Sequence, residues 1–124
     1  MAKLTIRIDF DDGRAVGHGK IRLLELIDAH GSIAAAGRAM DMSYRRAWLL
    51  VDDINHCFRH AVVTKQLGGS EGGGAALTPF GRTLIGHYHT VEKQSARATS
   101  ASLRVLQAAA APRRARRHRT KPDA

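Results

Sequence analysis

The chain has 124 residues, 44% of them hydrophobic, which suits one domain with its own core and is too short for two. No apolar run approaches the roughly 20 residues that a membrane-spanning helix needs, and the N-terminus lacks the pattern of a secretory signal. The single cysteine, Cys57, excludes an intramolecular disulfide framework. We therefore expect a cytoplasmic protein with no membrane partner.

The formal net charge is +9, and it is distributed over the whole chain. Residues 112–124 hold six cations against one aspartate, so the rest of the chain keeps a net charge of +4. A polyanion is the simplest partner for such a chain, because cations that neutralise phosphates release condensed counterions. The alternative is a charge that only keeps the chain soluble.

The first forty residues predict a strand and two helices. Residues 4–10 alternate apolar and polar side chains, which is typical of a half-buried strand, and the Asp11-Asp12-Gly13 turn ends it. Apolar residues at helical spacing predict a helix over 19–30, which Gly31 ends. A second, small-sided helix over 32–40, capped by Ser32, leaves room for close approach of another helix.

A third helix is predicted over 43–58, with Ser43 as its N-cap. Its first turn holds polar and cationic side chains, Tyr44, Arg45 and Arg46. Two helices joined by a short turn, the second opening with such residues, are typical of a helix-turn-helix. Trp48 borders the apolar face of this helix, so we expect it in core or interface packing.

The remaining pattern predicts a hairpin and a long helix. β-prone residues over 61–67 and 75–77 flank a glycine-rich loop, and Thr78-Pro79 begin a helix that meets no breaker before Pro112. An approximate heptad seam runs along this helix, beginning with Phe80, Leu84, Tyr88 and Val91. A seam that is longer than the core of one chain requires suggests a partner helix from a second copy, so we expect a homodimer. The alternative is that helical order ends near residue 93.

Together these elements predict a mainly α fold with a small β hairpin: a winged helix-turn-helix with a long C-terminal dimerisation helix. The DNA-binding domain would span residues 1–78 and the linker or dimerisation helix residues 79–111. A disordered basic tail over 112–124 would strengthen binding to any DNA, or serve only solubility.

Several stretches resemble the DNA-binding domain of ModE-type molybdate-responsive regulators, itself similar to the amino-terminal domain of LysR-type regulators. The matching residues lie within 4–91: Gly31-Ser32-Ile33, the run from Ser43 to Trp48, Asp52, Asn55, the glycine loop around Gly68 to Ala75, Leu77-Thr78 and Gly81. The resemblance implies a winged-helix fold, a dimer built through the first and last helices, and a near-palindromic operator. No counterpart of the family's molybdate-binding domains follows the last helix, so we do not expect molybdate sensing.

The sequence departs from the family pattern at two places. One is the turn between the second and third helices, and the other is the glycine-rich hairpin loop, which corresponds to the family's wing. Asp41 stands where the family usually has glycine, and aspartate is among the few residues that tolerate left-handed geometry. Ser70 and Glu71 replace a lysine and a glycine of the wing, and Glu71 would repel phosphate. Arg46, where alanine is common, adds a cation that compensates.

The candidate DNA-binding residues are Ser43, Tyr44, Arg45, Arg46, Lys65, Gly68, Gly69, Gly72 and Gly73. Hydroxyl groups in the first turn of a recognition helix position it on phosphates, and an arginine fork fits guanine O6 and N7. Which of Arg45 and Arg46 reads a base stays open. Lys65 would touch the flanking backbone, and glycines would bring backbone N–H groups close to phosphate.

Two other functions compete with a sequence-specific transcriptional regulator. The first is an architectural, nucleoid-associated protein that uses the same fold and tail for weakly specific binding. The second, of another class, is a metal-binding sensor that uses His56, Cys57, His60, His87 or His89. Because no catalytic triad, cofactor motif or effector site is recognisable, we expect no enzyme, no cofactor and no identifiable small-molecule effector.

Overall fold

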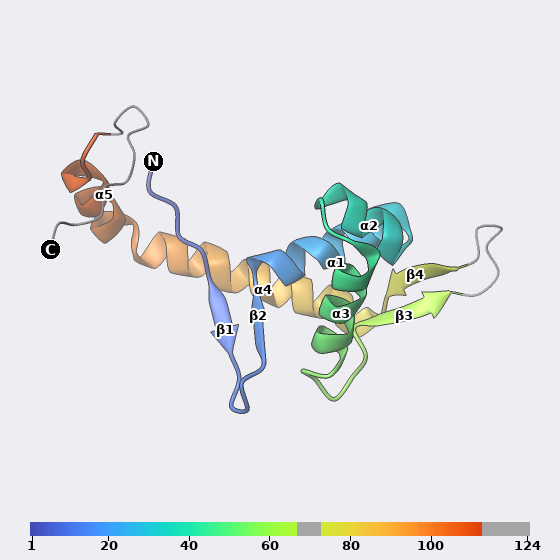
Figure 1. Cartoon of the computed structure of the whole chain (residues 1–124). Coiled ribbons are helices and arrows are strands. Elements are labelled where there is room, and N and C mark those ends of the chain that lie inside the picture. The colour runs from blue at the N-terminus through green and yellow to red at the C-terminus, as the bar shows by residue number, and fades with distance from the viewer. Residues whose placement is uncertain (67–72, 113–124) are drawn as a thin grey trace, which may run out of the picture.

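The computed structural model describes residues 1–66 and 73–112 of the chain (Figure 1). Within them, five helices and two antiparallel two-stranded sheets follow in the order β1, β2, α1, α2, α3, β3, β4, α4 and α5. The predicted class, mainly helical with little β structure, is confirmed, although two hairpins form where one was expected.

The first hairpin joins β1 (Arg7–Asp9) to β2 (Ala15–Gly17), with Ile8 opposite Val16. Gly13 in the turn has a φ of 87°, which a glycine adopts at little cost. The sequence predicts β1 and the turn but misses β2, because three residues are too few to display a periodicity. Val16 is almost fully buried, so pairing and packing rather than pattern define this strand.

Helix α1 (His18–His30) forms the centre of the protein, with Ile21, Leu24 and Ile27 at most 2% exposed. As predicted, Gly31 ends it: its φ is 78°, and its N–H donates to the Ile27 carbonyl oxygen at 2.8 Å.

Helices α2 (Ile33–Ala39) and α3 (Tyr44–Asn55) follow, and both predicted N-caps are present. The Ser32 hydroxyl accepts from the Ala35 N–H at 3.0 Å. The two helices approach closely, since a Cβ built on Gly37 would lie 3.0 Å from that of Ala47. Helix α3 ends three residues before the predicted position.

The second hairpin pairs β3 (Val63–Gln66) with β4 (Gly74–Leu77), and Val63 lies opposite Leu77. Both strands occur where the sequence predicts them. The loop between them, including Gly68, Gly69 and Gly72, lies outside the described residues.

Helix α4 (Pro79–Ala98) begins at the predicted Thr78 cap, whose hydroxyl accepts from the Gly81 N–H at 2.9 Å. The prediction of one uninterrupted helix to residue 111 is wrong, because the chain breaks at Thr99 and continues as α5 (Ser100–Ala109). The Ser95 carbonyl oxygen accepts both from the Thr99 N–H at 3.0 Å and from the Thr99 hydroxyl at 2.7 Å, an arrangement that often bends helices. The basic tail from residue 113 onward lies outside the described residues.

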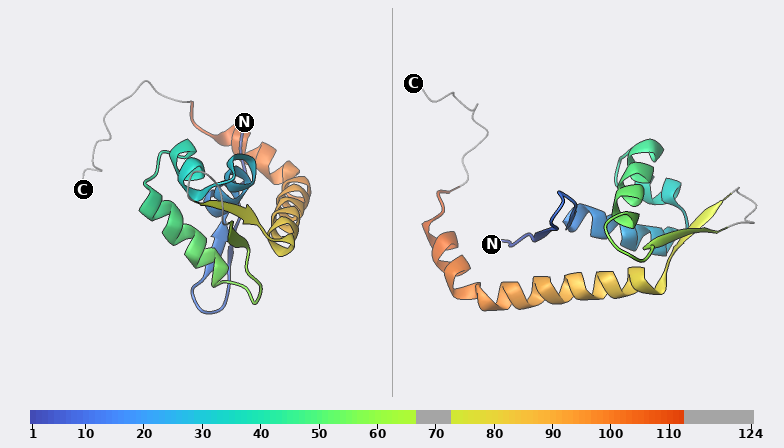
Figure 2. Two further views of the ribbon diagram at one scale, coloured as in Figure 1. Left: turned by 90° about the vertical axis from the view of Figure 1, so that its right-hand side faces the viewer. Right: turned by 90° about the horizontal axis from the view of Figure 1, so that it is seen from below.

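Helix α1 separates two sides of the molecule. Helices α2 and α3 and the β3–β4 hairpin gather at one end, whereas α4 runs along the opposite side of α1 from α3 (Figure 2). The core lies between them and draws on α1, α2, α3, both hairpins and Tyr88 of α4. This arrangement leaves the outer face of α3 and the outer face of α4 pointing in different directions.

Candidate nucleic-acid interface

The first turn of α3 is built as the sequence predicts. The Ser43 hydroxyl accepts from the Arg46 N–H at 3.1 Å, which caps the helix. Tyr44 is 54% exposed, and Ser43, Arg45 and Arg46 are exposed as well. The positive end of the helix dipole and two guanidinium groups therefore meet solvent at one place, where an anion would be stabilised.

The turn between α2 and α3 depends on Asp41, whose φ is 58°. This left-handed geometry is the one expected where the ModE-type pattern has glycine. Two neighbouring N–H groups, of Met40 and Met42, donate to the Gly37 carbonyl oxygen at 3.0 Å each, and the Asp41 N–H donates to Arg38. The N–H groups of residues 40–42 are thus all hydrogen-bonded to the end of α2, which fixes the start of the turn.

Some cations of the described chain are paired with carboxylates and others are not. The hairpin and helix cations Arg7, Arg14, Lys20, Arg22 and Arg82 all lie within 4.0 Å of a carboxylate. Over residues 1–66 and 73–112, no such ion pair involves Arg38, Arg45, Arg46 or Lys65. The unpaired cations elsewhere in the described chain include Lys3, Arg59, Lys93, Arg97 and Arg104. Sequence reasoning did not single out Arg38, which is exposed in the last turn of α2. Unneutralised cations on α2, α3 and β3 favour a polyanion at this surface.

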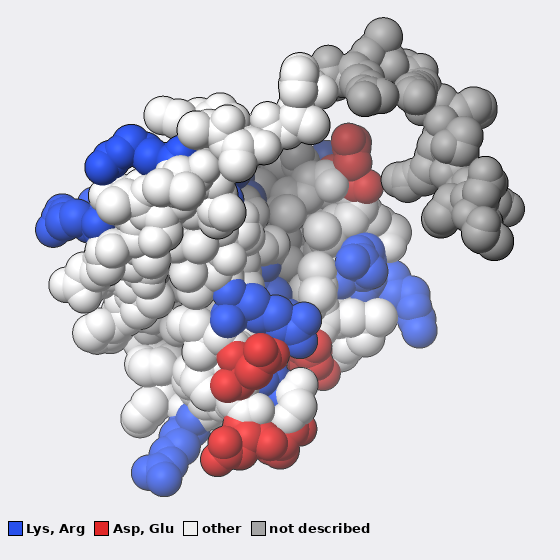
Figure 3. Space-filling view, turned by 90° about the vertical axis from the view of Figure 1, so that its left-hand side faces the viewer, with Lys and Arg blue, Asp and Glu red and all other residues white. Residues whose placement is uncertain are grey.

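The end of the molecule opposite the β3–β4 hairpin also carries cations. There, acidic and basic side chains adjoin one another toward the lower middle of the face, and further basic side chains stand apart from acidic ones toward its left edge (Figure 3).

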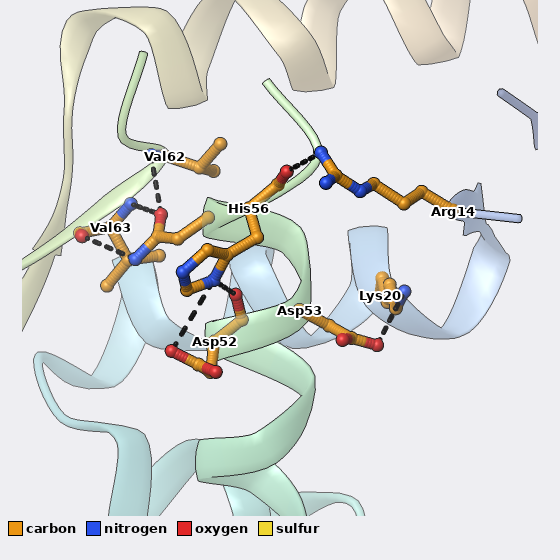
Figure 4. Close-up of polar contacts among 8 residues, drawn as sticks. Arg14, Lys20, Asp52, Asp53, His56, Val62 and Val63 are labelled. Carbon is orange, nitrogen blue, oxygen red and sulfur yellow. Dashed lines mark hydrogen bonds and ion pairs between the residues drawn. The ribbon is translucent and has the colours of Figure 1, made fainter. Parts of the chain in front are cut away.

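The far end of α3 is fixed by polar contacts to the first hairpin and to α1 (Figure 4). Lys20 pairs with Asp53 at 3.4 Å, and the Arg14 guanidinium donates to the His56 carbonyl oxygen. The His56 ring nitrogen Nδ1 lies 2.7 Å from the Asp52 carbonyl oxygen. These contacts pair the carbonyl oxygens of Asp52 and of the C-cap His56, and the Lys20–Asp53 pair links the end of α3 to α1.

Asn55 fastens the second hairpin to α3. Its Oδ1 accepts from the N–H groups of Val62 at 2.7 Å and Val63 at 3.0 Å, while its Nδ2 donates to the Val63 carbonyl oxygen at 3.1 Å. Val62 and Val63 are buried, so no water replaces these bonds. In the sequence, Asn55 stands out only as part of the ModE-type pattern, because one sequence does not show which backbone groups an amide will meet.

The predicted wing residues are only partly described. Lys65 is exposed on β3, on the same hairpin that Asn55 anchors to α3. Gly73 is exposed directly before β4, whereas Gly68, Gly69 and Gly72 fall outside the described residues. Lys65 and the first turn of α3 therefore lie on two elements, β3 and α3, that the Asn55 hydrogen bonds join.

The predicted dimerisation residues separate into two groups. Phe80 and Leu84 are half-buried against the core, and Tyr88 is 1% exposed, with its hydroxyl donating to the Ile6 carbonyl oxygen at 2.6 Å. Tyr88 thus belongs to the core of the chain itself and offers no free seam surface, which corrects its predicted place. Val91, at 38%, remains exposed. A heptad pattern does not distinguish a partner helix from the protomer's own core.

The histidines proposed as metal ligands have other contacts. Both ring nitrogens of His89 lie against carboxylates, 2.7 Å from Glu25 and 2.8 Å from Glu92. These hydrogen bonds raise the pKa of His89, because a ring that donates from both nitrogens is protonated. Burial raises the pKa of the Cys57 thiol. Among the described residues, no three His, Cys, Asp or Glu side chains are grouped so as to hold a metal ion.

Trp48, expected in core or interface packing, is 37% exposed and so is not part of the buried core; an interface place for it stays a prediction. Its neighbour Ala47 fills the buried side of the helix at the crossing with α2.

In the described part of the chain, no helix is long and apolar enough to cross a membrane. The described residues therefore define a small, mainly helical protein with a capped, cationic helix start beside a β hairpin.

Comparison with known proteins identifies relatives of the chain. No family model matches the chain. It is 38% identical to the molybdenum transport protein ModE of Azotobacter vinelandii over 85 residues, which are 68% of this chain and 32% of the relative. Identity to the DNA-binding transcriptional dual regulator ModE of Escherichia coli (strain K12) is 38% over 69 residues, 56% of this chain and 26% of the relative.

A third relative is the molybdenum-pterin-binding protein MopB of Rhodobacter capsulatus, 42% identical over 80 residues, which are 64% of this chain and 30% of the relative. The chain spans about a third or less of the length of these three proteins. The resemblance to ModE-type proteins inferred from the sequence is confirmed over this part of the chain.

Proposed function

We propose that this chain is a sequence-specific, DNA-binding transcriptional regulator that acts as a homodimer through a winged helix-turn-helix. In this proposal α2 and α3 are the helix-turn-helix, α3 is the recognition helix and the β3–β4 hairpin is the wing. The observation that carries it is the capped, exposed start of α3, where Arg45 and Arg46 have no counter-charge among the described residues. Similarity to a DNA-binding transcriptional regulator over the matched residues supports the same function.

Each candidate residue has a physical role in this proposal. Arg45 and Arg46 contact base edges in the major groove, where a guanidinium fork fits guanine. The Ser43 and Tyr44 hydroxyls donate to phosphate oxygens at the helix N-terminus and set the register without reading sequence. Lys65 on the wing neutralises the flanking backbone.

The outer side of α4 and α5 supports the homodimer. Helix α5 has no buried residue, and its Val105 and Leu106 are 68% and 64% exposed. An open hollow of about 370 Å³ lies between α1, β4 and α4, and Gly86 on its rim has no atom within 4 Å of a built Cβ. A second copy that covers these surfaces would explain a glycine inside α4 and apolar side chains in solvent.

The test of DNA binding is selection of duplexes from a random pool by the wild-type protein, followed by titration of the selected duplex. The R45A/R46A double variant is expected to lose discrimination between selected and random duplex, at about 1–3 kcal/mol for each guanine contact removed. The R7A/R22A variant is the matched control, because it removes the same charge from β1 and α1. Equal losses in both variants would mean that net charge, and not α3, recognises the DNA.

The architectural alternative and the homodimer are tested separately. A regulator protects discrete half-sites separated by about one helical turn at physiological salt, whereas an architectural protein gives broad protection. Sedimentation equilibrium is expected to give twice the chain mass for the wild type. Introducing a charge on the exposed helices, as V91E or L106E, is expected to give monomers; a wild type that is already monomeric refutes the dimer.

A further inference from the structure

The second turn of α3 exposes two large apolar side chains. Leu49 is 46% exposed and Trp48 is 37% exposed, and with Tyr44 they are three of the large hydrophobic residues that the described chain leaves in solvent. Scattered exposed leucines are ordinary, but several on one 12-residue helix form a surface. Neither Leu49 nor Trp48 has a place in the DNA contacts proposed above.

Helical spacing places this surface beside the cationic turn. The buried side of α3 consists of Ala47, Val51 and Ile54. Leu49 follows Arg45 by four residues, and Trp48 follows it by three, so all three share the outer face. The apolar surface therefore continues directly from the arginines along the helix.

We propose that Leu49 and Trp48 form a thymine-reading surface that contacts 5-methyl groups in the major groove. This inference rests on the proposed DNA binding by α3 and adds a base class to it. The methyl group of thymine is the apolar group that base edges present in the major groove. A helix whose first turn reaches that groove through Arg45 carries its second turn along the same groove.

The neighbouring charges favour DNA over a protein as the occupant. A protein that covered Leu49 would also cover the Arg45 guanidinium, which has no ion pair among the described residues. Burying that charge without a partner is costly. A duplex supplies guanine acceptors or phosphate oxygens to Arg45 and methyl groups to Leu49 at the same time.

Replacing thymine by deoxyuridine tests this directly, because uracil keeps every hydrogen bond of thymine and lacks only the methyl group. The probe is the duplex that the wild-type protein selects from a random pool. Uracil at one contacted position is expected to weaken binding about fourfold, and at both symmetric half-sites by more than about tenfold. Uracil in the flanks, outside the protected region, is the control and leaves affinity unchanged.

The protein side of the test uses the W48A/L49A variant. If these side chains contact the methyl groups, the variant binds thymine and uracil duplexes equally well. Equal weakening by uracil in wild type and variant overturns the proposal, since another group then reads the methyl. Urea unfolding confirms that the variant is folded, and the wild-type measurement decides the question independently of it.

The outcomes separate this proposal from the proposed function. A wild-type protein that selects no duplex refutes DNA binding itself. A protein that selects a duplex and binds its uracil form with unchanged affinity refutes only the thymine-reading surface. A selected site that has no thymine in the protected region likewise refutes only the thymine-reading surface.

Discussion

The Asn55 amide holds the β3–β4 hairpin against α3, and its removal gives the sharpest test of how the two are coupled. Truncation in N55A deletes three hydrogen bonds, two of them accepted from N–H groups of buried valines. A buried donor left unpaired costs about 1–3 kcal/mol. Because relaxation re-pairs part of what is lost, we expect the free energy of unfolding to fall by about 2–4 kcal/mol.

The assay is equilibrium unfolding in urea followed by far-UV circular dichroism. The expected loss corresponds to a midpoint shift of about 1–2 M. The N55D variant is the matched comparison: it keeps an acceptor for both N–H groups and loses the donor to the Val63 carbonyl, so it is expected to lose less. A midpoint for N55A within about 0.3 M of the wild type would refute the coupling derived from these distances.

Three further outcomes follow from other contacts. G81A is expected to destabilise the fold by at least about 2 kcal/mol, since its Cβ would lie 2.4 Å from the Val62 carbonyl oxygen. G86A places its Cβ in open space and is expected to raise the free energy of unfolding by about 0.5–1 kcal/mol; a contact of Gly86 with a partner helix would remove this gain. Thermal unfolding compares the two variants. The raised pKa of His89 means that the folded state holds its proton more tightly, so unfolding free energy falls as pH rises from about 6.5 through the raised pKa. Because His89 is partly exposed, the change in unfolding free energy stays below about 1 kcal/mol. The H89Q variant is expected to lose this dependence of stability on pH. The H87Q control, which changes an exposed histidine of the same helix, is expected to keep it. T99A tests whether the Thr99 hydroxyl bond to Ser95 causes the break. If it does, α4 and α5 join in the variant and the distance between spin labels on the two helices lengthens; an unchanged distance contradicts this cause.

Much of the local structure could be predicted because it depends on neighbouring residues. Ser32, Ser43 and Thr78 each cap a helix whose first N–H groups are a few residues away, and Gly31 ends α1 by its own backbone preference. Asp41 adopts the left-handed geometry that its place in the turn demands. The capped cationic turn of α3 was predictable for the same reason.

What could not be predicted depends on contacts between distant parts of the chain. Tyr88 bonds to Ile6 across 82 positions, so its heptad place gave no warning that it faces the core of its own chain. Asn55 acquires its partners only when β3 folds back on α3. The exposure of Trp48 arises because the small Ala47 occupies the helix crossing instead. The break at Thr99 interrupts a stretch with good helical propensity on both sides and without glycine or proline, so no pattern in the sequence marks it.

The β3–β4 hairpin is attached to the rest of the protein through both of its strands. Asn55 binds the residues that enter β3, and the Ala75 N–H of β4 donates at 2.9 Å to the carbonyl of Gly31, between α1 and α2. Two such attachments leave the hairpin base little freedom to pivot relative to α3. A ligand that engages both elements therefore meets a preorganised surface, and its association forfeits little conformational entropy.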